Sequence, residues 1–156
     1  MHLEQFLRRF ESVFRDRSAY QISVGAPLGI IAEAEVRLEV AFPEPVRRFY
    51  EACNGIQVDE PALKVLPVTD LHRNGSLIVF CICNHAHRIA FRLDELNPSG
   101  QWSIVDAETD YEITLSMASF WSIHLWHWLI DRRMIWRDYW IDETGRQSGG
   151  AIDAST

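Results

Sequence analysis

The chain has 156 residues, of which 47% are hydrophobic and 24% are charged, the proportions of an ordinary globular protein. Its formal net charge is −7, and residues 59–115 alone carry nine acids and four bases. A segment this acidic is a poor candidate for binding nucleic acid, which requires a basic surface. We find no signal peptide and no apolar run long enough to span a bilayer, so we expect no membrane partner and a cytoplasmic location. The three cysteines, an odd number without a secretory signal, favour reduced thiols.

Helical patterns dominate the first third of the chain. Apolar residues at positions i, i+3, i+4 and i+7 predict an amphipathic helix with an aromatic stripe over residues 3–15. A second helix is expected at about 31–39. A third, short helix is expected at 45–53, with Asn54-Gly55 as its left-handed C-terminal cap.

From residue 64 onward the apolar period changes from 3.6 to 2, which predicts strands. The connections between these strands are too short for crossover helices, so we expect a mainly antiparallel sheet of about five to six strands. The most apolar of these segments, 77–83, is expected to be a central strand. The predicted strands are 64–68, 77–83, 88–93, 102–106 and 111–115.

The C-terminal part of the chain predicts a long helix that packs on the sheet. Ser116 can cap this helix, which is apolar over a wide arc and extends to about Met134. The order of helices, then strands, then helix predicts an α+β fold. We expect one domain over residues 1–143, and a small, polar and mobile tail at 144–156.

The segment AEVRLEVAFPEPVRRFYEACNG, residues 34–55, resembles the signature of the SUKH superfamily. That superfamily includes the yeast Smi/Knr-type regulators of cell-wall synthesis and many bacterial immunity proteins. The predicted strands and the start of the last helix follow in the family's order, so the resemblance covers roughly residues 28–130. Glu39 departs from the pattern, which usually has Gly there; because a left-handed Glu costs about 1 kcal/mol, we expect the helix to end differently. The matching residues are Glu35, Leu38, Phe42, Pro43, Phe49, Tyr50, Asn54 and Gly55.

The resemblance implies a binding protein and not an enzyme. Bacterial members neutralise a toxin encoded beside them, often a nuclease or a deaminase. The implied function is therefore immunity through direct binding and occlusion of a cognate protein toxin, with no cofactor. The alternative is a regulatory or scaffold domain that binds an endogenous protein, like the eukaryotic members.

An acidic segment is the first candidate binding surface. Residues 59–115 hold nine acids and four bases, and four of the acids lie together in 106–112. One interpretation of this stretch is a solvated loop. The other is a rim that receives Arg or Lys side chains from a toxin. The candidate partner-binding acids are Asp106, Glu108, Asp110 and Glu112.

An aromatic segment is the second candidate. Residues 121–140 contain five of the six tryptophans, and one helix face cannot bury all of them. Either they pack in the core with a final short element folded back, or some contact a toxin or a second copy in a homodimer. Trp, Tyr and Arg are common interface hot spots. The candidate residues are Trp136, Arg137, Tyr139 and Trp140.

The stretch CICNHAHR, residues 81–88, alternates possible metal ligands with other residues. Four alternate positions of a strand span about 20 Å, too far to converge on one ion. We therefore expect a strand and a polar turn, with the two cysteines on one face and Ile82 packed with Phe80 on the opposite face. The histidines would be turn residues whose titration modulates partner binding. The four residues are Cys81, Cys83, His85 and His87.

Other patterns give no support for catalysis. His124 and His127 lack the acid of a His-Glu-x-x-His motif, so we expect ordinary helix histidines. Cys53 is predicted at a helix C-terminus, where the pKa of a thiol rises, which makes it a poor nucleophile. The sequence contains no Walker loop, dinucleotide fingerprint or Gly-x-Ser-x-Gly elbow. We expect no catalytic residue and no metal.

Overall fold

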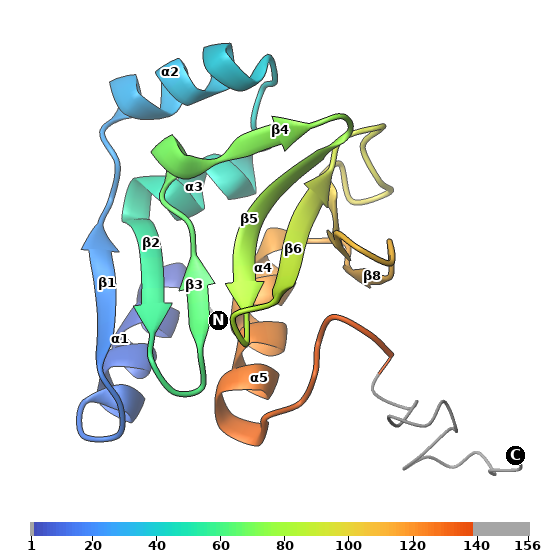
Figure 1. Ribbon diagram of the computed structural model, residues 1–156. Helices are drawn as coiled ribbons and strands as arrows, with labels where there is room; N and C mark the ends of the chain where they lie inside the picture. The colour runs from blue at the N-terminus through green and yellow to red at the C-terminus, as the bar shows by residue number, and fades with distance from the viewer. Residues whose placement is uncertain (1, 139–156) are drawn as a thin grey trace, which may run out of the picture.

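A computed structural model of the chain describes residues 2–138. An antiparallel sheet of eight strands forms its centre, and helices cover one face of that sheet (Figure 1). The predicted α+β fold is confirmed, with more strands than expected. The described helices are α1 (Leu3–Phe14), α2 (Leu28–Leu38), α3 (Glu44–Ala52), the 3-10 turn η1 (Val68–Asp70), α4 (Met117–Ser119), the π-turn η2 (Phe120–His124) and α5 (Leu125–Asp131).

The strands follow one another in the order β1-β2-β3-β5-β6-β7-β8, and β4 pairs with β5 beside this path. Because β5 pairs with β3, β4 and β6, the prediction of a central strand at 77–83 is confirmed. The strands are β1 (Tyr20–Val24), β2 (Cys53–Val58), β3 (Leu63–Val65), β4 (His72–Asn74), β5 (Leu77–Cys83), β6 (His87–Arg92), β7 (Ser103–Asp106) and β8 (Glu112–Thr114).

The core lies between the sheet and the helices behind it in Figure 1, α1, α4 and α5. The aromatic stripe of α1, Phe6, Phe10 and Phe14, is fully buried. The Phe6 ring lies 5.2 Å from Trp121 and 5.5 Å from Trp126 of the C-terminal helix. Burying each such side chain contributes roughly 1.5–3 kcal/mol, so this aromatic contact stabilises the pairing of the two ends of the described chain.

The C-terminal helix begins as predicted and ends early. The Ser116 hydroxyl accepts a hydrogen bond from the Ser119 N–H, which confirms the cap. The helix spans residues 117–131 with a π-turn in its middle, and stops where Arg132 adopts the left-handed conformation (φ 58°). The predicted continuation to Met134 is wrong, and the chain instead follows an irregular path over residues 132–138, which we call the strap.

The expectation that Glu39 avoids the left-handed conformation is wrong. Its φ and ψ are 58° and 43°. The N–H groups of Glu39 and Val40 donate to the carbonyls of Val36 and Glu35, both at 3.1 Å, and close a Schellman cap. Arg73 also donates to the carbonyl of Glu39 and to the one before it. These hydrogen bonds offset the cost of a left-handed Glu.

Asn54-Gly55 is not a helix cap, so that prediction is also wrong. Cys53 already has extended backbone (φ −154°, ψ 117°) and is the first residue of β2. The Asn54 side-chain oxygen accepts a hydrogen bond from the Val68 N–H at 2.8 Å. Gly55 has φ +115°, and a Cβ there would lie 2.9 Å from the Val65 carbonyl oxygen. The two residues therefore serve a close crossing of β2 past the end of β3.

A β-bulge corrects the predicted face of one residue in β5. The register against β6 shifts between Val79 and Cys81, which leaves Phe80 as the extra residue. Phe80 therefore enters the core together with Cys81, and its ring stacks on Phe91 at 3.9 Å. The prediction that Ile82 shares the opposite face with Phe80 is wrong, because the bulge separates their faces.

Candidate functional site

The residues that carry the family resemblance hold the fold together. The Glu35 carboxylate accepts hydrogen bonds from the Phe42 N–H at 2.7 Å and from Arg47 at 2.9 Å, which ties α2 to α3. Tyr50, fully buried, donates its hydroxyl to the Leu66 carbonyl at 2.9 Å. These contacts give Glu35 and Tyr50 a structural role in the fold.

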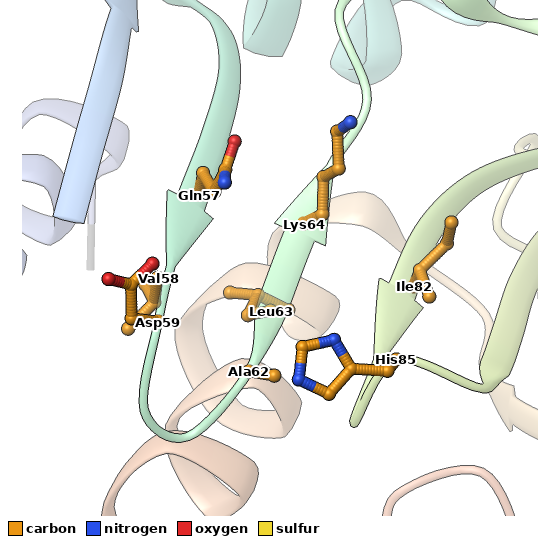
Figure 2. Close-up of a pocket in the computed structure, with 8 residues that line it drawn as sticks. All are labelled: Gln57, Val58, Asp59, Ala62, Leu63, Lys64, Ile82 and His85. Atoms are coloured by element: carbon orange, nitrogen blue, oxygen red, sulfur yellow. The ribbon is translucent and has the colours of Figure 1, made fainter. Parts of the chain in front are cut away.

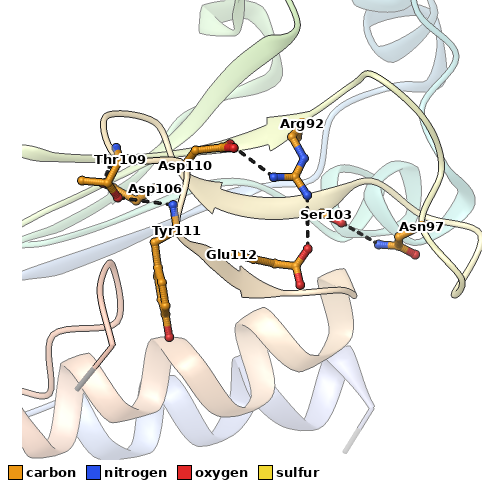
Figure 3. Close-up of polar contacts among 8 residues, drawn as sticks. All are labelled: Arg92, Asn97, Ser103, Asp106, Thr109, Asp110, Tyr111 and Glu112. Carbon is orange, nitrogen blue, oxygen red and sulfur yellow. Dashed lines mark hydrogen bonds and ion pairs between the residues drawn. The ribbon is translucent and has the colours of Figure 1, made fainter. Parts of the chain in front are cut away.

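Asp106 is the first of the predicted partner-binding acids, and it is buried. Its carboxylate accepts hydrogen bonds from the Thr109 N–H at 3.0 Å and from the Thr109 hydroxyl at 2.6 Å (Figure 3). Only 3% of Asp106 is exposed. It shapes the loop between β7 and β8 and does not face a partner.

Two other predicted acids surround an arginine of β6. Arg92 lies 3.2 Å from Asp110 and 3.2 Å from Glu112, and Figure 3 shows it held between them. Both acids remain substantially exposed, so each pair contributes at most about 1 kcal/mol to stability. Glu108, also exposed, lies in the loop before them. These three acids are available to a partner.

The structure adds further residues to this acidic surface. A hollow of about 880 Å³ lies beside Arg92 and is lined by four carboxylates. Leu96 and Leu115, 58% and 36% exposed, also line it. We call it the acidic hollow; its carboxylates belong to Asp94, Glu95, Asp110 and Glu112. The sequence analysis missed Asp94 and Glu95. Their position directly after the predicted strand 88–93 is the signal that could have found them.

The three cysteines are all buried and free. Burial raises the pKa of the Cys53 thiol to about 11, despite an opposing effect of the Gly55 backbone. Burial, followed by the neighbouring Cys83, raises the pKa of Cys81 well above its usual range. The predicted direction for Cys53 is right, but its main cause is burial and not the helix end. All three thiols are poorly suited to nucleophilic chemistry.

The two histidines of CICNHAHR have different surroundings. His85 lies in the tight turn between β5 and β6 with φ 65°, next to Asn84 with φ 53°, a pair typical of hairpin turns. His87 is the first residue of β6 and stacks against Trp136. Within residues 2–138, no three His, Cys, Asp or Glu side chains are grouped as metal ligands would be.

The strap contains two of the predicted aromatic-segment residues. Trp136 is only 5% exposed and lies 5.2 Å from Trp128, so it offers a partner little surface. Arg137 is partly buried. Tyr139 and Trp140, the other two candidates, lie outside the described residues, as does the predicted tail at 144–156.

The helix histidines form a pair beside the strap. The rings of His124 and His127 are 6.2 Å apart. Burial, and then the proximity of His127, lowers the pKa of His124. Both residues line a small hollow together with Arg133 and Arg137.

The face of the sheet turned toward the viewer in Figure 1 carries a second hollow, of about 390 Å³. Figure 2 shows Gln57, Lys64 and Ile82 projecting from neighbouring strands, with His85 at the hairpin turn below them. Its polar groups are of mixed type and are not arranged for an evident reaction. The sequence analysis did not find it, because it depends on the pairing of β3 between β2 and β5.

No helix in the described part of the chain is long and apolar enough to cross a bilayer. Comparison with known protein families and with curated proteins gave no match to this chain.

Proposed function

We propose that the chain is an immunity protein that binds a cognate bacterial toxin and occludes its working surface. The proposal combines the SUKH-like segment at 34–55 with one structural observation. That observation is the acidic hollow, which is lined by four carboxylates, Arg92 and two exposed leucines.

The chemistry of the hollow suits a basic protein partner. Asp94 and Glu95 have no described ion pair with another side chain, whereas Asp110 and Glu112 share Arg92. An incoming Arg or Lys side chain can pair with the first two acids and compete with Arg92 for the others. Complementary charge of this kind raises association rates and selects partners. Leu96 supplies apolar area that a charged surface alone lacks.

A toxin that acts on nucleic acid needs a basic surface of its own, because phosphate backbones are bound by Lys and Arg. An acidic binder that covers this surface blocks the toxin without any chemistry. The alternative, a regulatory or scaffold domain for an endogenous protein, would use the same hollow with a different partner. The identity of the partner therefore separates the two.

The test is co-expression with the toxic open reading frames that flank the gene. We expect the wild-type chain to restore growth and to co-purify with one of them. The triple variant Asp94→Lys/Glu95→Lys/Glu112→Lys should lose protection and bind at least about tenfold more weakly. Asp106 is left unchanged because its reversal would disrupt the loop.

The matched control is Glu11→Lys/Asp16→Lys/Glu33→Lys, which changes the net charge equally at exposed positions on α1, the turn after it and α2. It should protect like the wild type. If both triple variants lose protection equally, bulk charge and not the hollow is responsible. If no flanking toxin is bound or neutralised, the immunity function is refuted.

A further inference from the structure

A small hollow lies between the C-terminal helix, the strap and the start of β8. Its volume is about 90 Å³, roughly the share of three water molecules at ~30 Å³ each. Figure 3 shows Tyr111 pointing from the start of β8 toward this helix. The polar side chains that line the hollow are Tyr111, His124, His127, Arg133 and Arg137.

The lining is basic in a protein whose net charge is −7. No carboxylate is among the described residues that line it. The Nε and Nη2 atoms of Arg137 are buried and have no hydrogen-bond partner. These two nitrogens lie on one edge of the guanidinium and present two parallel N–H donors, the arrangement that binds oxyanions in a bidentate manner. A buried charged donor without a partner is costly, so pairing of Arg137 with an anion would be favourable.

Two histidines approach from the helix side. His124 is the last residue of the π-turn η2, and π-turns inside helices are rare and frequently occur at functional sites. His127 lies one turn further along, with its ring 6.2 Å away. Both imidazoles line the hollow and can donate N–H groups to an anion there.

The helix end does not oppose an anion strongly. Unpaired carbonyls at a helix C-terminus disfavour negative charge. Here the carbonyls of Trp128 and His127 accept hydrogen bonds from the N–H groups of Arg132 and Arg133, at 3.1 Å and 2.9 Å. The start of the strap therefore satisfies two of the carbonyls at this helix end.

We propose that this hollow binds a small tetrahedral oxyanion, inorganic phosphate or the phosphoryl group of a small molecule, with Arg137, His124 and His127 as its hydrogen-bond donors. The site is separate from the acidic hollow, so it does not depend on the proposed immunity function. A bound anion would join the strap to the C-terminal helix.

The test is calorimetric titration of the purified chain with inorganic phosphate and with phosphoserine, in a buffer free of other oxyanions. We expect saturable binding of at least one ligand. Tighter binding of phosphate identifies the free ion as the ligand, and tighter binding of phosphoserine identifies a phosphomonoester. Arg137→Gln and His124→Gln should each weaken binding by about tenfold or more, because each removes a hydrogen bond to a charged group. Arg88→Gln, on the exposed face of β6, is the matched control and should bind like the wild type.

A second measurement uses the wild-type chain alone, so it stands even if a variant fails to fold. Histidine ring NMR should show that saturating ligand raises the pKa of His124, against the lowering that burial and His127 impose. The other titratable groups that line the hollow are Tyr111, His127, Arg133 and Arg137. Absence of binding, binding that Arg137→Gln and His124→Gln leave unchanged, or an unchanged His124 pKa at saturation overturns the proposal.

Discussion

The indole of Trp136 lies flat on the imidazole of His87, with ring centroids 4.0 Å apart and planes 8° apart. The stack joins the strap to the first residue of β6. The Trp128 ring contacts Trp136 edge-on, with ring centroids 5.2 Å apart. The strap is thus packed into the domain beside the hairpin between β5 and β6.

Replacing Trp136 by Ala should lower the free energy of unfolding by about 3–5 kcal/mol, the usual cost of emptying a large aromatic site. Urea denaturation followed by circular dichroism measures this. The matched control is Ile130→Ala, since Ile130 is 41% exposed on α5 and should change stability by no more than about 0.5 kcal/mol. Similar small losses in both variants would show that Trp136 is not a core residue.

The left-handed Glu39 predicts a substitution that raises the free energy of unfolding. Glu39→Gly should stabilise the protein by about 1 kcal/mol, because Gly adopts this conformation without the steric cost of a Cβ. Glu33→Gly, inside α2, should destabilise it by about 1 kcal/mol, because Gly is a poor helix former. Thermal unfolding of the two variants beside the wild type measures both. A loss of stability in Glu39→Gly would mean that the Glu39 side chain stabilises the fold by more than its left-handed backbone costs.

Two of the three strands that the sequence analysis missed, β2 and β4, lack the pattern it relies on. All three residues of β4 are exposed, so no alternation of apolar and polar residues marks it. β2 begins at Cys53 directly after α3, and its Asn54-Gly55 pair is also the usual signal of a helix end. The long, strongly patterned segments, α1 and β5, were predicted nearly residue for residue.

The candidate site was only partly predicted, because its contacts depend on tertiary structure. Clustering of acids along the chain pointed to 106–112, but only tertiary structure shows that Asp106 is buried and that Arg92 lies between Asp110 and Glu112. Contacts of this kind depend on strand register, which a composition count does not contain. The unpaired nitrogens of Arg137 likewise cannot be predicted from the sequence.

The buried cysteines predict low thiol reactivity. At pH 8, a thiol reagent such as Ellman's reagent should not label the folded chain on the timescale of an exposed cysteine, because burial removes access and raises the pKa of Cys53 and Cys81. In denaturant, all three thiols should react. Ser76→Cys, at an exposed turn, is the positive control. Rapid labelling of one or more thiols in the folded wild type would contradict this arrangement.

His124 predicts how stability depends on pH. Burial, and then His127, lowers its pKa below the ordinary value of 6.5 that the unfolded chain has. Below pH 6.5 the unfolded state therefore binds a proton more readily than the folded state does. The contribution of His124 to stability is fully present above this pH and is lost as the pH falls from 6.5 toward the lowered value.

The measurement compares the urea midpoints of the wild type and His124→Gln at pH 7.5 and pH 5.5, in a buffer without phosphate. The wild type should lose more stability on acidification than the variant, because Gln cannot bind the proton. Added phosphate should reduce the wild-type loss if the anion pairs with the protonated ring. Equal losses in both proteins without phosphate would show that His124 is not the group whose protonation opposes folding.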